Sequence, residues 1–181
     1  MMFKIQSMSR LMKLVLPIVL IASFSGPALS QQPLVVFLVR HAEKVDASEN
    51  PKLSTAGKAR ALTVAKTLRD ADIQYVHSTD FIRTKKTAAP IATKNGVKVE
   101  LYDAADLPAL VGQLKGKGGR HLVVGHSNTT PKLVALLGGE PGPKIQEMEY
   151  DRLYMITIGK DGDASTVLIR FGEAFASEPP E

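Results

Sequence analysis

The sequence predicts an α/β fold, a three-layer α/β/α sandwich whose mainly parallel sheet carries an antiparallel edge. Apolar, β-branched runs alternate with segments of helical periodicity over residues 34–139, the order typical of a parallel sheet with helices on both faces. The first run, LVVFLV, is continuously apolar, as expected of a strand covered on both sides. Near the C-terminus two strand-like runs flank the turn KDGD, which predicts an antiparallel hairpin.

The first strand is predicted at Leu34 to Val39, and the polar loop EKVDASENPK follows it. Ser54 is a suitable N-cap for a helix in TAGKARALTVAKTLRDA. Leu62, Ala65 and Leu68 recur on one face of that helix, and an apolar face predicts packing against the sheet.

The same alternation continues along the chain. A short strand is predicted in IQYVHS (73–78), and a helix in RTKKTAAPIATKNG ends on Asn95-Gly96, a C-terminal stop signal. The next elements are VKVELY as strand, ADLPALVGQLKG as helix, RHLVVGHS as strand and TTPKLVALLGG as helix. Pro131 is tolerated in the first turn of that last helix, and Gly138-Gly139 ends it. RLYMITIG and STVLIRFG form the predicted hairpin.

The first thirty residues have the pattern of a secretory signal peptide. Basic residues precede an apolar run, Leu14 to Ala22, which leads to small residues at Ala28 and Ser30. The run is far shorter than the roughly 20 residues of a membrane-spanning helix, and the A-x-S ending is typical of a cleavage site. We therefore expect cleavage after Ser30, no stable membrane anchor, and a periplasmic or secreted protein. The remainder is predicted to be one domain over 31–172 and a disordered tail over 173–181.

Charge and cysteine content exclude several classes. The predicted leader contains three Lys/Arg and no acids, so its removal lowers the formal charge from +5 to +2, which gives no reason to expect nucleic acid as a partner. The most basic stretch, QLKGKGGR at Gln113 to Arg120, has no interleaved aromatic residues and predicts a solvated loop. The chain has no cysteine, which excludes disulfides, thiol catalysis and cysteine-ligated metals.

Two predicted strands end on histidine. Arg40-His41 follows the first strand, and His126 follows VVG in a later one. Ligands of open α/β sheets bind beyond the carboxyl ends of the strands, so both imidazoles can reach one crevice. Arg83 opens the helix that follows QYVHS and adds a second guanidinium. Such a crevice, with few carboxylates, suits a dianion.

A phosphoryl group is the dianion that fits these residues. Guanidinium forks bind its oxygens bidentately, stay charged, and stabilise the charge that develops in the transition state. One imidazole can attack phosphorus and form a phosphohistidine that water later hydrolyses, which divides one hard step into two. The second histidine, beside a helix start near Thr129, would bind the same oxygens together with backbone N–H groups.

Four motifs in this order resemble the histidine phosphatase superfamily, branch 1, the phosphoglycerate-mutase-like group. LVRHAEK is similar to its R-H-[GA]-E signature, and LSTAGKARA to its L-[ST]-x-x-G helix start. STDFIRTKKTAAPIA is similar to its S-x-x-x-R segment, and VVGHSNT to its second-histidine motif. DRLYMITI extends the resemblance, so it spans essentially the whole chain after the leader. The resemblance implies the phosphoglycerate-mutase-like fold.

The resemblance also implies roles for four residues. His41 corresponds to the nucleophile that becomes phosphorylated, and Arg40, Arg83 and His126 correspond to the phosphate pocket, with His126 also catalytic. Glu43 follows the signature without a required chemical role, and we expect it to orient the pocket.

The resemblance leaves the general acid open. A protonated carboxyl must stand near the leaving oxygen, with its pKa raised enough to donate near neutral pH. Many mutase-like members use a glutamate after the third strand, where ELYDAAD offers Asp103 at the nearest position, with Glu100 and Asp106 as rivals. The acid-phosphatase branch uses an aspartate directly after the second histidine, where this chain has Ser127. Asp103 is the predicted acid, and a phosphoramidate substrate would need no strong acid.

The remaining polar residues have structural interpretations. His77 and His121 match no motif and are expected to be structural. Ser54 and Gly57 are expected to shape a helix start. Asn128 and Thr129 are expected to cap the last helix, and Asn128 is also a candidate to hold the pocket.

No metal or other cofactor is expected. The chain has no H-x-x-x-H or H-E-x-x-H spacing, and the two arginines would repel a cation from the paired histidines.

The predicted function is that of an exported, metal-independent phosphatase. It would hydrolyse phosphomonoesters or phosphoramidates through a phosphohistidine on His41. A short connection from Arg83 to His126 predicts an open crevice, which admits a small ester, a phosphoprotein or a phosphorylated envelope component. The alternatives are a module that binds phosphate or a phosphorylated ligand without turnover and, ranked lower, a phosphomutase, because related mutases carry longer insertions and act in the cytosol.

Overall fold

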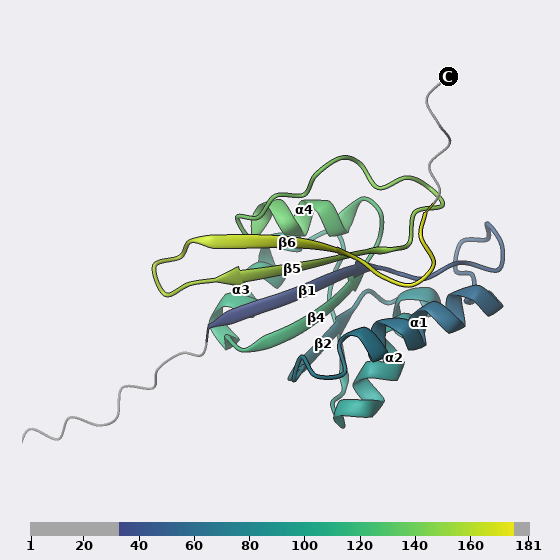
Figure 1. The fold of residues 1–181 in the computed structure, drawn as a ribbon, viewed down its shortest axis with the longest axis horizontal. Helices are drawn as coiled ribbons and strands as arrows, with labels where there is room; N and C mark the ends of the chain where they lie inside the picture. The colour runs from purple at the N-terminus through teal and green to yellow at the C-terminus, as the bar shows by residue number, and fades with distance from the viewer. Residues whose placement is uncertain (1–32, 176–181) are drawn as a thin grey trace, which may run out of the picture. The chain divides into compact units, whose positions relative to one another are not determined.

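The computed structural model describes residues 33–175, which belong to one compact unit (Figure 1). The predicted signal peptide lies outside the described residues, as do residues 176–181 of the predicted tail. Of that tail, residues 173–175 are described: Arg60 donates to the Glu173 carbonyl, and the Phe175 N–H donates to Asp151. Within the described range, no helix has the length and apolar character needed to cross a bilayer.

A six-stranded mixed sheet forms the centre of the fold. Its strand order is β3-β2-β4-β1-β5-β6, with parallel pairing from β3 to β1 and antiparallel pairing of β1 with β5 and of β5 with β6. The predicted α/β class, with an antiparallel edge made by the last hairpin, is confirmed. The elements in chain order are β1 (Leu34–Arg40), α1 (Thr55–Thr67), β2 (Tyr75–Ser78), α2 (Ile82–Asn95), β3 (Val99–Leu101), α3 (Leu107–Lys117), β4 (Arg120–Gly125), α4 (Thr129–Leu136), β5 (Arg152–Ile158) and β6 (Ala164–Arg170).

Helices cover the two faces of this sheet in pairs, which confirms the three layers (Figure 1). Alternate residues of β1 divide between the faces: Val36 and Leu38 pack in the core with α3 and α4, and Phe37 and Val39 pack in the core with α1 and α2. Both faces of the central strands are therefore buried, which is why LVVFLV has no polar residue.

Local signals account for most helix ends. The Ser54 hydroxyl accepts a hydrogen bond from the Gly57 N–H at 3.0 Å and caps α1, while Gly96 ends α2 at a φ of 66°, where a side chain would be strained. Asn128 occupies the N-cap position of α4 but its side chain makes no capping bond. The stretch from Gln113 to Arg120 is not the loop predicted from its charge, because its first five residues complete α3.

The buried face of α1 differs from the predicted one. Ala65 and Leu68 are buried as expected, but Leu62 is 63% exposed, and Ala61 lies inside in its place. One step along a helix turns the side chain by about 100°, so the face centred on Ala61 and Ala65 turns Leu62 toward solvent.

A buried ion-pair cluster holds the segment between α4 and β5. Glu149 and Arg152 are both almost fully buried and pair at 2.5 Å, and Arg170 of β6 reaches Glu149 at 2.7 Å. Asp151 pairs with Arg170 at 2.6 Å. These ion pairs hold residues 146–149 in place next to the end of β1.

Candidate active site

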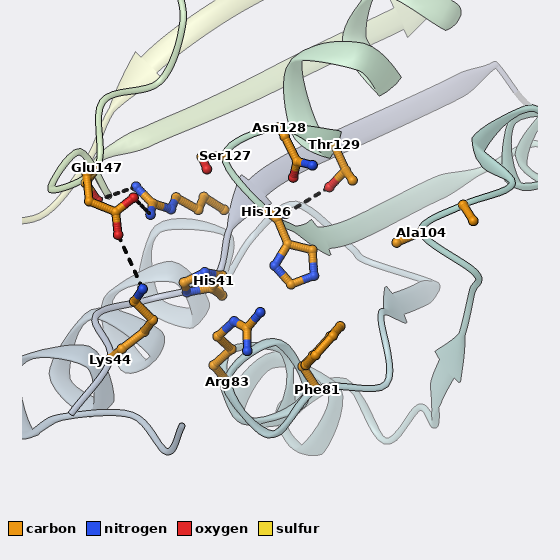
Figure 2. Close-up of a pocket in the computed structure, with 12 residues that line it drawn as sticks. His41, Lys44, Phe81, Arg83, Ala104, His126, Ser127, Asn128, Thr129 and Glu147 are labelled. Carbon is orange, nitrogen blue, oxygen red and sulfur yellow. Dashed lines mark hydrogen bonds and ion pairs between the residues drawn. The ribbon is translucent and has the colours of Figure 1, made fainter. Parts of the chain in front are cut away.

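A cavity of about 510 Å³ lies at the carboxyl ends of β1 and β4 (Figure 2). His41 directly follows β1 and His126 directly follows β4, and the His41 N–H donates to the Gly125 carbonyl at 2.8 Å, which ties the two strand ends together. The cavity is lined by Arg40, His41, Lys44, Phe81, Arg83, Ala104, Ala105, His126, Ser127, Asn128, Thr129 and Glu147. The four pocket residues predicted from the sequence thus line one cavity.

Backbone hydrogen bonding selects the tautomer of His41. Its Nδ1 lies 2.8 Å from the Ala42 carbonyl oxygen. A carbonyl can only accept, so Nδ1 carries the proton and Nε2 keeps a lone pair. Nε2 has no hydrogen-bond partner in the described part of the chain, and the ring lines the cavity.

The surroundings of His41 keep this imidazole neutral. The side chain is almost fully buried, and burial is the largest cause that lowers its pKa to about 3, with further lowering by Arg40, His126 and Arg83. A neutral imidazole is the nucleophilic form, so His41 is available for attack at any pH well above 3.

A hydroxyl relay orients His126. Its Nε2 lies 3.0 Å from the Thr79 hydroxyl, which lies 2.9 Å from the Thr84 hydroxyl. The Thr84 hydroxyl donates to the backbone carbonyls of Thr79 and Phe81, so Thr79 donates to Thr84 and accepts from the His126 Nε2–H. This leaves Nδ1 of His126 unprotonated. Burial first, and then Arg83 and Arg40, lower the pKa of this imidazole to about 4.

Arg40 is a buried cation built into the cavity wall. Its Nη1 donates to the backbone carbonyls of Gln146, Glu147 and Glu149 at 2.8, 2.7 and 3.2 Å, and its guanidinium lies 4.3 Å from the Tyr150 ring centroid. Its Nε is buried without any hydrogen-bond partner. Buried donors are nearly always paired in native proteins, so this N–H is a hydrogen-bond donor that no described residue uses.

Arg83 faces the histidines from the start of α2 (Figure 2). Its guanidinium stacks 4.3 Å from the Phe81 ring, Nη1 donates to the Glu49 carbonyl at 3.2 Å, and Nε is likewise buried and unpaired. Burial is the largest cause that lowers the pKa of Arg83, and the charge of Arg40 is the second. An arginine side chain nevertheless stays charged. Two guanidiniums that repel each other in this way favour an anion between them.

Two charged residues of the cavity wall, Lys44 and Glu147, were not predicted from the sequence. Glu147 accepts from Lys44 at 3.2 Å and from Arg40 at 3.5 Å, although its side chain is 70% exposed (Figure 2). The hydrogen bond from Lys44 is the largest cause that lowers the pKa of Glu147. Nothing in the local sequence indicates that Glu147 contacts Arg40, because the two residues lie 107 positions apart in the chain.

The predicted general acid does not line the cavity. The exposed Asp103 carboxylate accepts from the Ala105 N–H in a local turn, and it is Ala104 and Ala105 that face the cavity. Asp106 caps α3, and Glu100 is bound by Lys117, which is the largest cause that lowers the pKa of Glu100. Among the described residues, Glu147 is the one carboxylate in the cavity wall.

Glu43 and Gly57 lie behind the cavity. The Glu43 carboxylate accepts from the Arg60 Nε at 2.6 Å, which joins the loop after β1 to α1. A Cβ on Gly57 would overlap the Glu43 backbone carbonyl, so the helix start can approach this loop only with glycine at that position.

His77 and His121 form a separate buried pair. Their Nε2 and Nδ1 atoms lie 2.9 Å apart, and the second nitrogen of His121 donates to the Gly118 carbonyl. Both pKa values are lowered, chiefly by burial. Residues 33–175 contain no group of three or more His, Cys, Asp or Glu side chains placed to hold a metal ion.

Comparison with known proteins agrees with this geometry. Residues 36–106 match the histidine phosphatase superfamily (branch 1). The matched histidine phosphatase segment contains the first three motifs and both arginines of the cavity, whereas His126 lies beyond it. No curated protein matches the chain in sequence.

Several solved structures share the fold. The protein histidine phosphatase SixA complexed with tungstate is 20% identical, with a TM-score of 0.60 over 75% of this chain and 96% of that one. The mycobacterial glucosyl-3-phosphoglycerate phosphatase is 14% identical, with a TM-score of 0.61 over 77% and 99%. The phosphoserine phosphatase of Entamoeba histolytica in complex with 3-phosphoglyceric acid is 17% identical, with a TM-score of 0.57 over 77% and 97%. At these identities the likeness establishes the phosphoglycerate-mutase-like fold.

Proposed function

We propose that this protein is a metal-independent histidine phosphatase that transfers a phosphoryl group to Nε2 of His41 and then to water. One observation carries the proposal: the Ala42 carbonyl holds the proton of His41 on Nδ1, so a neutral, unpaired Nε2 faces a cavity with two buried guanidinium donors. The match of residues 36–106 to histidine phosphatases supports it. So do the oxyanions, tungstate and 3-phosphoglyceric acid, in two structures of the same fold.

Two displacements complete the reaction. In the first, the Nε2 lone pair of His41 forms the N–P bond as the bond from phosphorus to the leaving atom breaks. The leaving atom keeps the electrons of that bond; a phosphoramidate nitrogen already carries the proton it needs, and an ester oxygen takes its proton from water. The Ala42 carbonyl stabilises the positive charge that forms on the ring. In the second, water attacks phosphorus, the N–P bond breaks, and its electron pair returns to Nε2, which releases inorganic phosphate.

The cavity cations bind the phosphoryl oxygens in both steps. The Nε donors of Arg40 and Arg83 are free for this, and their charge stabilises the transition state. A bound dianion also favours the protonated form of His126, whose Nδ1 can then donate to phosphoryl oxygen.

The choice of leaving group depends on the general acid, and none of the described residues in the cavity wall is a protonated carboxyl. Glu147 has a lowered pKa and is charged near neutral pH, and the three candidate acids Glu100, Asp103 and Asp106 do not line the cavity. Alkyl ester oxygens need a strong proton donor, whereas a phosphoramidate nitrogen is basic enough to bring its own proton. Of the two predicted substrate classes, the phosphoramidates fit better, and aryl esters should also react.

The test measures hydrolysis of a phosphoramidate, an aryl phosphate and an alkyl phosphate by residues 31–181 with EDTA present. His41→Ala should abolish turnover, and Asp103→Asn is the matched control that should retain it. An acid-labile, base-stable phosphoprotein should accumulate in the wild type and in Asp103→Asn, and not in His41→Ala. Activity that survives in His41→Ala, or that disappears with EDTA, would refute the proposal. Tight phosphate binding with no turnover of any substrate would establish a binding module instead.

We further propose that the protein is exported, on the basis of residues 1–30. Expression of the full chain in a Gram-negative host, followed by N-terminal sequencing, tests this. A mature N-terminus near Gln31 in the periplasm or medium is expected, whereas an uncut chain in the cytoplasm would exclude export.

A further inference from the structure

A second hollow, of about 570 Å³, lies between α1 and α2. It shares no lining residue with the catalytic cavity, although the two are neighbours: Ile82 lines the hollow, and Phe81 and Arg83 on either side of it line the cavity. Its volume lies within the range of roughly 300–1,000 Å³ that is typical of small-ligand sites.

Apolar side chains make up the body of this hollow. Leu53 and Ala61 are 5% and 2% exposed and belong to one small core cluster, and Ile82 and Pro90 stand on the α2 side. Leu62 lies at the opening with 63% of its surface exposed. A leucine that packing does not bury, beside an apolar hollow, adds apolar surface for an occupant.

Three lysines surround the same hollow. Lys52, Lys58 and Lys86 all line it, and within residues 33–175 none of them forms an ion pair or a hydrogen bond through its side chain. Other lysines nearby are paired, such as Lys44 with Glu147 and Lys85 with Asp80. Unpaired cations around an apolar hollow complement an occupant with an apolar chain and an anionic group.

We propose that this hollow binds a single-chain anionic amphiphile: an aliphatic chain that packs between α1 and α2, with a carboxylate-like head group among the three lysines. Lining composition favours such a ligand over a protein partner. Protein interfaces are enriched in aromatic residues and arginine and depleted in lysine, and this hollow has three lysines and neither aromatic residues nor arginine. The proposal is independent of the proposed phosphatase activity.

Titration calorimetry with dodecanoate, kept below its micelle concentration, tests this binding on residues 31–181. One dodecanoate per chain is expected. Each buried methylene is worth about fourfold in affinity, so octanoate, which is four methylenes shorter, should bind roughly 250-fold more weakly. Dodecylammonium has the same chain with a cationic head group and should not bind. Amide resonances should shift at Leu53, Leu62 and Ile82 in the wild-type protein, which locates the site without any substitution.

Substitutions with matched controls complete the test. Leu62→Gln, and Lys58→Glu with Lys86→Glu, should each weaken dodecanoate binding at least fivefold. Leu136→Gln on α4 and Lys115→Glu on α3, two exposed positions that do not line the hollow, should not, and circular dichroism checks that all variants are folded. The proposal is overturned if dodecanoate fails to bind, if dodecylammonium binds equally well, if resonances shift elsewhere, or if the protein binds anionic phosphatidylglycerol vesicles but not free dodecanoate.

Discussion

Replacing Thr79 with valine should impair catalysis while the fold survives. Thr79 is 2% exposed, its hydroxyl accepts from Nε2 of His126 at 3.0 Å, and no other described group holds that nitrogen. Valine keeps the shape of threonine and removes only the hydroxyl. The imidazole then has an unpaired N–H in a partly buried site and is free to turn away from the phosphoryl group.

The cost can be worked from these contacts. Leaving one buried polar group without its partner costs about 1–3 kcal/mol. If the transition state bears that cost, kcat/KM falls by about 5- to 150-fold. Folding should lose only about 1 kcal/mol, because the Thr84 hydroxyl still reaches the Thr79 and Phe81 carbonyls at 3.0 and 2.9 Å.

Steady-state kinetics with an aryl phosphate and urea unfolding, run on the same preparations, separate the two effects. Thr79→Ser restores the hydroxyl and should recover most of kcat/KM, which a purely structural role would not require. The reasoning fails if Thr79→Val lowers the free energy of unfolding as expected yet leaves kcat/KM unchanged.

Three further results are expected. Glu147→Gln should tighten inorganic phosphate binding about two- to fivefold in calorimetry, because Arg40 and Lys44 lose a carboxylate that competes with phosphate for them. Weaker binding would instead make Glu147 part of the phosphate site. Burial lowers the pKa of His41 to about 3 and that of His77 to about 4, so the unfolded chain binds protons before the folded chain does as pH falls below 6.5. Each of the two histidines should therefore lower the free energy of unfolding by up to about 1.4 kcal/mol per pH unit down to about pH 4. Stability that is flat with pH would contradict this. Gly57→Ala should cost about 1–3 kcal/mol in urea unfolding, because its Cβ overlaps backbone, whereas Gly116→Ala in open space should stabilise by up to about 1 kcal/mol; equal effects would refute the packing argument.

Signals that act within a few residues made much of the fold predictable. Ser54 caps α1 through a bond to Gly57, and Gly96 ends α2 in a left-handed conformation, both within one turn of the helix concerned. Strand ends were predictable for the same reason, so His41 and His126 could be expected at one sheet edge. Their catalytic roles stay predictions that the His41→Ala test addresses.

Orientation within an element was harder to predict. Ala61 and Leu62 are neighbours, and the more apolar of the two is the exposed one. Residue type did not decide between them, because the phase of α1 is set by the whole buried face and by the close approach of Gly57 to Glu43. In the same way, Asp103 stands next to two residues of the cavity wall, yet a local turn directs its carboxylate elsewhere.

By itself, the sequence determined the order of strands and helices, the Ser54 cap of α1 and the Gly96 end of α2, and the two strand ends that place histidines and arginines at one edge. Those features depend on periodicity and on contacts between residues close in the chain. Tertiary structure alone decided that Arg40 is braced by carbonyls more than 100 residues away, that Glu147 is the carboxylate in the cavity wall, and that α1 and α2 leave a hollow ringed by lysines. These features depend on contacts between segments that are far apart in the chain, and such contacts cannot be predicted from the local sequence.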